Sequence, residues 1–341
     1  MKRLIIILMA IFLTVSFTTI MLISPNPCFA NALNDYNSGV KADKRDDHDL
    51  AIELYTRAIN SGDLNYKILG WAYGNRGACW MQKGKEYNDK ALSDLNKAIQ
   101  LNPLDDALYN NRGLVLGDKG NLSQQFADYN KAIKLNPRSG SAYSNRGVFW
   151  AKKRDYNRAI ADFNKAIELD SCDSKSYFNR GLVWKKKGKY DLAIADFTKA
   201  IELKKDYAFA YGHRASALSK KGDYGRAIDD YIKVIGIKPK DSRAYNCLAW
   251  LLATCPDSKY QNGTKAVELG KKAVELNPKF YTLDTLASAY ARAGRFEDAV
   301  QTQEKVITLL KNTGKTKALA KCLEHMKFYK AHKPWRESRN L

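Results

Sequence analysis

The fold of this 341-residue chain is decided by residues 140–173, which read GSAYSNRGVFWAKKRDYNRAIADFNKAIELDSCD. Apolar or small side chains recur at helical spacing from Tyr143 to Ala151, the segment KRDY breaks the pattern, and a second helical run extends from Ala159 to Leu169. Near-copies of the motif YSNRG begin at residues 73, 109, 177 and 211, and those from residue 109 onward recur every 34 residues. A period of 34 residues predicts stacked two-helix hairpins.

Set in one frame, the chain contains about eight such units, which begin near residues 32, 70, 106, 140, 174, 208, 242 and 280. Each first helix carries a small residue that permits close helix approach: Gly39, Gly77, Gly113, Gly147, Gly181, Ala215, Ala249 and Ala287. A second small residue lies early in each second helix, except that the third unit has Gln125 there. This exception predicts looser packing in the third unit.

The pattern resembles the tetratricopeptide repeat (TPR) family. Residues 140–173 match its consensus at Tyr143, Gly147 and Phe163 among others, whereas Ser171 stands where the family has Pro. The resemblance implies an all-α fold, a right-handed superhelical solenoid of about eight TPR helical hairpins over residues 32–313. A C-terminal capping helix and tail are expected over residues 314–341. The expected packed side chains of that helix are Leu319, Leu323, Met326 and Phe328 or Tyr329.

The N-terminus has a different character. Lys2 and Arg3 precede an uncharged, mostly apolar run from Leu4 to about Ile23, and the segment SPNPCFANA follows. Small residues at the end of this segment suit a signal peptidase, while the apolar run is just long enough to span a bilayer. We therefore expect residues 1–30 to be a signal peptide or an N-terminal membrane anchor. Either would place the repeats outside the cytoplasm, in an exported or anchored protein.

Composition favours anionic partners and offers no sign of catalysis. Lys and Arg number 57 against 36 Asp and Glu, which gives a net charge of +21. The six cysteines are scattered and predict no disulfide framework, although Cys247 and Cys255 form the nearest pair. None of the four histidines stands in a metal-binding spacing, and no phosphate-binding glycine loop occurs. The sequence thus predicts a non-enzyme without cofactor, metal site or small-molecule substrate.

The arginine of the repeated motif has a candidate partner in its own unit. In five units an aspartate stands on the second helix, at the same distance from the turn as the arginine on the first. Units one, seven and eight lack both residues. We therefore expect ion pairs within each hairpin. Asp162→Ala should then lower stability more than the double variant Asp162→Leu, Arg146→Leu, because only the single change leaves a charge without its partner. The predicted pairs are Arg76–Asp94, Arg112–Asp128, Arg146–Asp162, Arg180–Asp196 and Arg214–Asp230.

The resemblance also implies that the first helices line a peptide-binding groove. Asparagines one residue before the arginines match the family's peptide-binding asparagine, whose amide both donates and accepts. Basic and apolar side chains on neighbouring groove positions suit an extended, acidic segment. The expected groove residues are Asn75, Asn111, Asn145, Asn179, Lys152, Lys153, Lys175, Phe178, Leu182, Lys185, Lys186 and Trp250. Two plainer interpretations stay open: the asparagines bond a neighbouring helix, and the lysines form solvated helix ends.

These features predict a scaffold that binds an extended, acidic segment of a protein or peptide outside the cytoplasm. An alternative is electrostatic binding of an anionic envelope polymer or, less favoured, nucleic acid, which would weaken with salt. A purely structural spacer without a discrete ligand is the third hypothesis. Membrane contact is expected only through the N-terminal segment.

Overall fold

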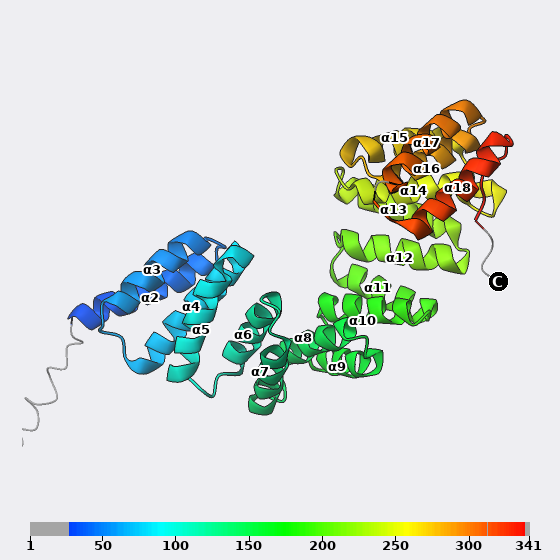
Figure 1. Cartoon of the computed structure of the whole chain (residues 1–341). Helices are drawn as coiled ribbons and strands as arrows, with labels where there is room; N and C mark the ends of the chain where they lie inside the picture. The colour runs from blue at the N-terminus through cyan, green and yellow to red at the C-terminus, as the bar shows by residue number, and fades with distance from the viewer. Residues whose placement is uncertain (1–26, 312, 338–341) are drawn as a thin grey trace, which may run out of the picture. The chain divides into compact units, whose positions relative to one another are not determined.

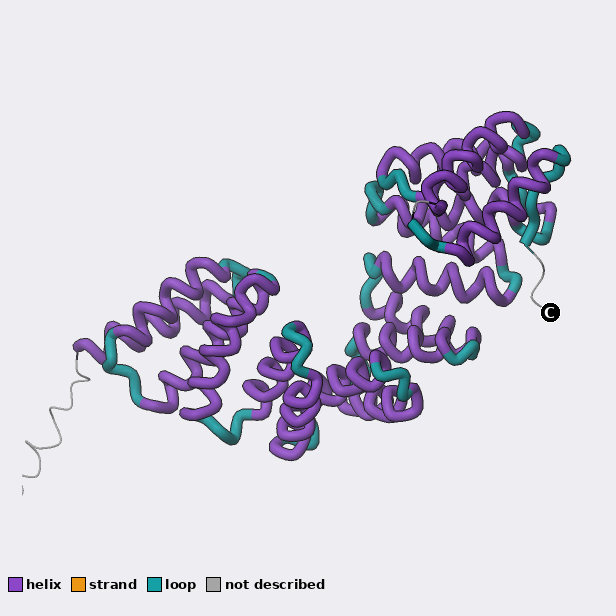
Figure 2. The backbone as a smooth tube through the Cα atoms, in the orientation of Figure 1, coloured by secondary structure: helices purple, strands orange, loops and turns teal. Residues whose placement is uncertain are grey.

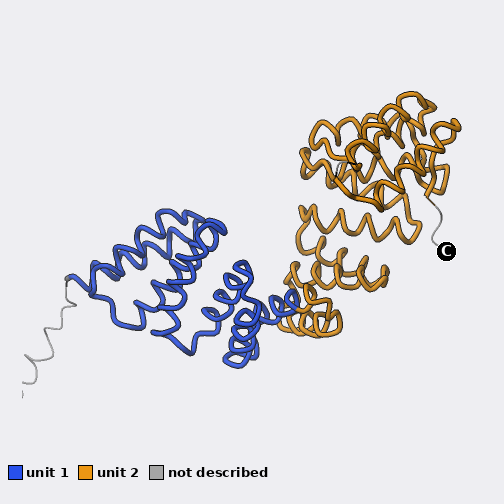
Figure 3. Tube along the Cα trace, viewed as in Figure 1, with its two compact units in different colours: residues 1–149 blue, residues 150–341 orange. Residues whose placement is uncertain are grey.

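The computed structural model describes residues 27–311 and 313–337, and every regular element in those residues is a helix (Figures 1 and 2). The chain divides into two compact units, residues 1–149 and 150–341 (Figure 3). Most of the predicted signal or anchor segment, residues 1–26, lies outside the described residues. Across the part that is described, none of the helices combines the length and apolar character needed to cross a membrane.

Unit 1 is built from antiparallel helix pairs. Helix α2 packs on α3, α4 on α5 and α6 on α7, and α3 and α5 also contact the first helix of the next pair. The dividing point of the two units falls inside α8. These helices are α2 (Pro27–Asp43), α3 (His48–Asn60), α4 (Tyr66–Lys83), α5 (Asn88–Leu101), α6 (Asp106–Asp118), α7 (Leu122–Leu135) and α8 (Gly140–Lys152), with a short 3₁₀ helix, η1 (Lys85–Tyr87).

Unit 2 repeats the same arrangement. Helix α9 contacts α10, and α10 to α17 form four hairpins in which each second helix packs on the next first helix. Helix α18 covers α17 at the end of the stack. The helices are α9 (Tyr156–Leu169), α10 (Ser174–Lys186), α11 (Tyr190–Leu203), α12 (Ala208–Lys221), α13 (Tyr224–Ile237), α14 (Ser242–Thr254), α15 (Gly263–Leu276), α16 (Phe280–Arg292), α17 (Phe296–Lys311) and α18 (Thr316–Lys330), with the 3₁₀ helix η2 (Ser258–Tyr260).

The predicted all-α stack of helical hairpins with a terminal helix is confirmed. From residue 106 onward the first helices begin at the predicted unit starts. The first two helical hairpins differ from the prediction, because α2 begins at Pro27 and α4 at Tyr66 rather than at residues 32 and 70. Asn65 caps α4 by accepting from the backbone N–H of Ile68 at 3.0 Å, which favours a helix start just after Asn65.

Close approach inside a hairpin explains the small residue of the first helix. A Cβ atom on Gly181 would come within 2.8 Å of the Phe197 ring, and one on Gly113 within 2.6 Å of the Tyr129 ring. Phe197 and Tyr129 are buried aromatic residues of the second helices. The glycine therefore makes room for the largest core side chain of its own hairpin.

A matched pair of substitutions tests this explanation. Gly181→Ala is expected to lower the free energy of unfolding by about 1–3 kcal/mol through overpacking against Phe197. Gly212→Ala is expected to raise it by up to about 1 kcal/mol, because Ala favours helix over Gly. At Gly212, on α12, the nearest group is Val234 at 3.8 Å, an ordinary contact. Urea unfolding of both variants measures the difference, and equal effects would contradict the close-approach explanation.

The expected looser packing at Gln125 is wrong. Gln125 is buried, and its Nε2 donates to the Tyr129 hydroxyl at 3.1 Å. The side chain lies over Gly117, where an added Cβ would come within 2.2 Å of Nε2 of Gln125. A larger residue on one helix is thus matched by a missing side chain on the other.

The terminal helix α18 packs with a face that only partly matches the prediction. Met326 and Tyr329 are buried as expected, but Leu323 is 42% exposed. The face also contains Cys322 and His325, both buried, because positions 322, 325, 326 and 329 share one side of a helix. The prediction selected apolar residue types, whereas two of the packed side chains are polar.

An aspartate of α16 explains why polar residues of α18 are buried. Oδ1 of Asp284 accepts from Nε2 of Gln303 at 2.8 Å and lies 3.0 Å from Nδ1 of His325. The thiol of Cys322 is 3.5 Å from the same oxygen. Burial alone would raise the pKa of Asp284, but the hydrogen bonds led by His325 outweigh it and lower the pKa. The carboxylate therefore stays ionised and anchors α18.

Candidate functional site

An arginine and an aspartate form a two-point ion pair inside each of four hairpins. Nε and Nη2 of the arginine donate to the two carboxylate oxygens at 2.7–2.9 Å. The pairs are Arg76–Asp94, Arg112–Asp128, Arg180–Asp196 and Arg214–Asp230. Asp162 of the remaining predicted pair is also buried, and Arg146 donates to Asn130 at 2.7 Å. The aspartates are buried, and the hydrogen bonds to them raise the pKa of Arg112, Arg180 and Arg214 further.

The same arginines also contact the preceding hairpin, which the sequence analysis missed. Nη1 of each donates at 2.7–3.0 Å to a side-chain oxygen on the preceding second helix. The acceptors are Thr56, Asn96, Asn130, Asn164 and Thr198. A tyrosine three residues earlier lies under each guanidinium, with 5.5 Å from its carbon to the ring centre. The guanidinium N–H groups thus donate to partners inside the protein, so we assign the arginines a structural role.

A sequence signal for this third partner exists. In four of the five units the acceptor stands 16 residues before the arginine. In the hairpin of α14 and α15, Leu248 stands in place of the arginine. The residue 16 positions before it is Ile232, which is 55% exposed. Arginine, aspartate and the preceding Asn or Thr are therefore present or absent together.

The predicted groove asparagines are half-buried, and two of them bond a neighbouring first helix. Nδ2 of Asn145 donates to Oδ1 of Asn110 at 2.9 Å, and Nδ2 of Asn75 to the Tyr36 hydroxyl at 3.4 Å. For these two residues the plainer interpretation describes the contacts. Asn111 and Asn179 occupy the same half-buried place on α6 and α10.

The predicted basic residues do not gather at one point. Lys175 lies in the first turn of α10, whereas Lys185 and Lys186 lie in its last turn. Lys152, Lys153, Lys175 and Lys186 are exposed, as solvated helix ends would be, but Lys185 is half-buried. Leu182 is half-buried on α10. Lys185 differs from the exposed lysines, because its ammonium group contacts polar side chains of His213 and Ser216.

This polar cluster joins α10 to α12. Nζ of Lys185 lies 3.1 Å from Nδ1 of His213 and 3.4 Å from the hydroxyl of Ser216. The His213 ring faces Phe178 and Phe197, with ring centres 5.6 and 6.0 Å apart. Burial, with Lys185 nearby, lowers the pKa of His213 to about 4, and burial also lowers the pKa of Lys185. His213 is therefore neutral near pH 7 and accepts from the lysine.

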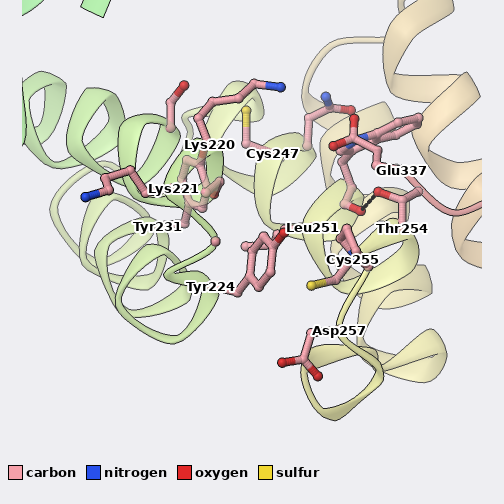
Figure 4. A pocket seen from close by; sticks show the side chains of 16 residues that line it. Lys220, Lys221, Tyr224, Tyr231, Cys247, Leu251, Thr254, Cys255, Asp257 and Glu337 are labelled. Carbon is pink, nitrogen blue, oxygen red and sulfur yellow. Dashed lines mark hydrogen bonds between the residues drawn. The ribbon is translucent and has the colours of Figure 1, made fainter. Parts of the chain in front are cut away.

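Two adjoining hollows extend from this cluster along α12 and α14. The smaller, of about 190 Å³, is lined by Lys185, Phe209, His213 and Arg243 among others. The larger, of about 560 Å³, is shown in Figure 4, and Ser216, Tyr231 and Cys247 line both. We call this surface the α12–α14 groove, defined by Lys185, His213, Ser216, Lys220, Asn246, Cys247 and Trp250. Oδ1 of Asn246 is buried there without a hydrogen-bond partner, which leaves an acceptor for a ligand.

The C-terminal tail of the chain lies at the far end of this groove. The Glu337 carboxylate accepts from the indole N–H of Trp250 at 2.9 Å. The backbone N–H of Glu337 donates to the Thr254 carbonyl at 3.0 Å. In Figure 4, Glu337 lies beside Thr254, across the hollow from Lys220 and Lys221. Trp335 packs against His325, with ring centres 4.7 Å apart. Trp250, predicted as an open groove residue, is thus in contact with Glu337 of the segment that follows α18.

His213 gives the groove a pH dependence that an asparagine would lack. Because its pKa falls from about 6.5 in the unfolded chain to about 4 in the fold, the unfolded state binds more protons between these values. Stability is therefore lost as the pH falls from about 6.5 to about 4, on the order of 2 kcal/mol. The first five hairpins have Asn at the position that corresponds to His213, and His213→Asn should remove this loss of stability. Urea midpoints of both proteins from pH 7 to pH 4 measure it, and parallel curves would contradict the assignment.

Comparisons with known proteins agree with this architecture. Four family models described as "Tetratricopeptide repeat" match residues 107–139 and 210–241, 127–174, 174–207 and 281–313. No curated protein matches the chain.

Several solved structures resemble the chain in fold. One, from a functional characterisation of PilF of Pseudomonas aeruginosa, is 21% identical, covers 62% of this chain and 94% of its own, and has a TM-score of 0.56. A tetratricopeptide repeat protein from Parabacteroides merdae is 20% identical, covers 76% and 99%, and scores 0.54. YrrB, described as a TPR protein with an unusual peptide-binding site, is 25% identical, covers 55% and 95%, and scores 0.47.

Proposed function

This chain belongs to the tetratricopeptide repeat family, and on that premise we propose that it is a protein-interaction scaffold that binds an extended acidic peptide segment in the α12–α14 groove. The observation that carries the proposal is the contact between Trp250 and Glu337, in which an indole N–H of the groove holds a carboxylate. A carboxylate from the chain's own tail indicates the chemistry that the groove accepts. A partner segment with Asp or Glu would make the same contact by displacing Glu337, because the indole has a single N–H.

Charge around the groove supports an acidic ligand. Lys220, Lys221 and Arg243 are exposed along its rim, while Asp257 and Glu337 are the acidic residues of the larger hollow. Lys221 is paired with Asp191, which leaves Lys220 and Arg243 to meet an incoming carboxylate. Such rim charges chiefly steer association and set specificity.

Uncharged contacts support an extended backbone. Oδ1 of Asn246 has no partner and faces the larger hollow, so it can accept a backbone N–H of the ligand. Tyr224, Tyr231 and Leu251 supply apolar surface beside it. Together these groups provide an acceptor, cationic donors and an apolar wall, and no catalytic step forms part of the proposal.

The alternative, electrostatic binding of an anionic polymer, predicts dependence on total charge rather than on the groove. Lys220→Glu should weaken binding of a labelled peptide of alternating Leu and Glu by about tenfold or more. Lys233→Glu makes the same charge change on α13, outside the groove and exposed, and should alter the affinity by less than about threefold. Fluorescence anisotropy of the full chain measures both. Equal weakening by the two variants would favour the polymer hypothesis and overturn the peptide site.

Export remains part of the proposal. It rests on Lys2 and Arg3, the apolar run after them and the small residues near Ala30. Sequencing the N-terminus of the protein isolated from its native cell tests signal cleavage. Protease protection in intact cells separates an exported or anchored array from one that stays in the cytoplasm.

A further inference from the structure

Three potential metal ligands meet where the first hairpin joins the second. Asp43 ends α2, His48 begins α3, and Cys79 lies in α4. Oδ1 of Asp43 is 3.1 Å from Nδ1 of His48 and 3.3 Å from Sγ of Cys79. The three ligand atoms all lie within 4.8 Å of one another. Residues up to 36 positions apart in the sequence thus converge on one point.

The spacing of these atoms matches a tetrahedral zinc site. Zn²⁺ binds sulfur at about 2.3 Å and imidazole nitrogen or carboxylate oxygen at about 2.0–2.2 Å, which at tetrahedral angles places neighbouring ligand atoms about 3.3–3.6 Å apart. The observed separations from Asp43 are close to these values, so small side-chain movements suffice. A mixed set of one sulfur, one nitrogen and one oxygen ligand suits zinc better than Mg²⁺ or Ca²⁺, which prefer oxygen ligands alone.

A fourth polar group near the cluster lacks a well-formed hydrogen bond. Tyr55 is fully buried in α3 and packs in the same core cluster as Cys79, and its hydroxyl lies near the Asn75 amide, which donates to Tyr36 instead. An orphan hydroxyl in a core is costly, and a water on a bound metal would give it a partner. The hydroxyl therefore points to a ligand in the cluster rather than to a closed hydrogen-bonded contact.

We propose that Asp43, His48 and Cys79 bind one Zn²⁺, with water as the fourth ligand beside the Tyr55 hydroxyl. The metal would join α2, α3 and α4 and so fasten the first hairpin to the second. Cys79 is buried, whereas His48 and Asp43 have 24% and 37% of their side chains exposed, which gives the ion an entry path. The sequence alone predicts no metal site, because no local spacing motif contains these three residues.

A second group of the same residue types provides an internal control. Asp284, His325 and Cys322 also lie together, but Oδ1 of Asp284 already accepts from Gln303 and the group is buried under Trp335. Within residues 27–311 and 313–337, the Asp43 group is the one whose three ligand atoms satisfy the mutual 4.8 Å limit. Cys322→Ser should therefore leave metal binding unchanged.

Titration of the metal-free, full-length chain with Co²⁺ and then Zn²⁺ tests the site. The wild type should show a thiolate-to-cobalt charge-transfer band and tetrahedral visible bands that saturate at about one equivalent and disappear when zinc displaces cobalt. Cys79→Ser should abolish the charge-transfer band and weaken zinc binding by about 100-fold, while His48→Gln should weaken it by at least about tenfold. Zinc should also raise the melting temperature of the wild type and of Cys322→Ser, but not that of Cys79→Ser.

The substitutions are conservative in size, and circular dichroism without metal verifies that each variant is folded. The proposal is overturned if the wild type binds Co²⁺ and Zn²⁺ no better than Cys79→Ser. It is equally overturned if the charge-transfer band survives in Cys79→Ser and is lost in Cys322→Ser.

Discussion

Replacing Asp196 with Ala is expected to lower the free energy of unfolding by about 3–5 kcal/mol, because it leaves the Arg180 guanidinium without its counter-charge inside the hairpin. Asp196 is 5% exposed and accepts from Nε at 2.9 Å and from Nη2 at 2.7 Å. After the substitution only the bond from Nη1 to Asn164 remains. Urea unfolding followed by circular dichroism measures the loss as a lower midpoint.

Two controls distinguish the buried pair from surface charge. The double variant Arg180→Leu, Asp196→Leu removes both charges and should cost less than about 1.5 kcal/mol, since apolar replacement of a buried pair is often close to neutral. Asp191→Ala removes an exposed carboxylate paired with Lys221 and should cost less than about 1 kcal/mol. If the double variant were as unstable as Asp196→Ala, the side-chain volume rather than the charge pair would explain the effect.

Asp284→Ala is expected to lower the free energy of unfolding by about 3 kcal/mol and to release the terminal helix, because three donors lose one acceptor. Gln303, His325 and Cys322 all direct polar atoms at Oδ1 of Asp284. Since His325 packs against Trp335, the tail that carries Glu337 should loosen with it. Urea unfolding gives the stability, and limited proteolysis near Lys330 reports the release of α18.

Asp298→Ala is the matched control, because Asp298 is an exposed carboxylate of α17 whose partner, Arg295, lies three residues before it. It should change the free energy of unfolding by less than about 0.5 kcal/mol and leave the cleavage pattern unaltered. Unchanged proteolysis in Asp284→Ala would show that Trp335 and the apolar face hold α18 without the aspartate.

How far the sequence predicts the structure depends on whether a contact repeats. The Arg–Asp pairs were predictable because five units vary together, and equal distances from a turn place two residues opposite each other in an antiparallel hairpin. The Asn or Thr partner has the same regular separation, but it belongs to the preceding hairpin and comes to light only when stacked helices are considered. Both contacts follow from the 34-residue period.

Contacts that occur once were missed. His213 replaces the repeated Asn and lies against Lys185, and Cys79, His48 and Asp43 meet from three separate helices. Neither arrangement has a periodic signal, so tertiary packing alone reveals it. The position of Glu337 beside Trp250 likewise depends on how residues 331–337 turn back over α14.

The predicted groove residues divide on physical grounds. Phe178 and Lys185 do approach the α12–α14 groove, because they lie two turns apart on the same face of α10. Lys152, Lys153 and Lys175 are exposed helix-end residues, where a long charged side chain is solvated by default. A pattern of basic residues thus identifies a charged surface, but it does not show which basic side chain lies in the binding groove.

The arginine contacts have a consequence for how the protein is made. Arg180 is held by Asn164, which precedes it, and by Asp196, which completes its own hairpin. Arg112 and Arg214 follow the same order with their own partners. Each hairpin therefore finds its polar partners in this network within itself and in the hairpin before it, and no later residue supplies one. The direction of these contacts allows the hairpins to fold one after another from the N-terminus.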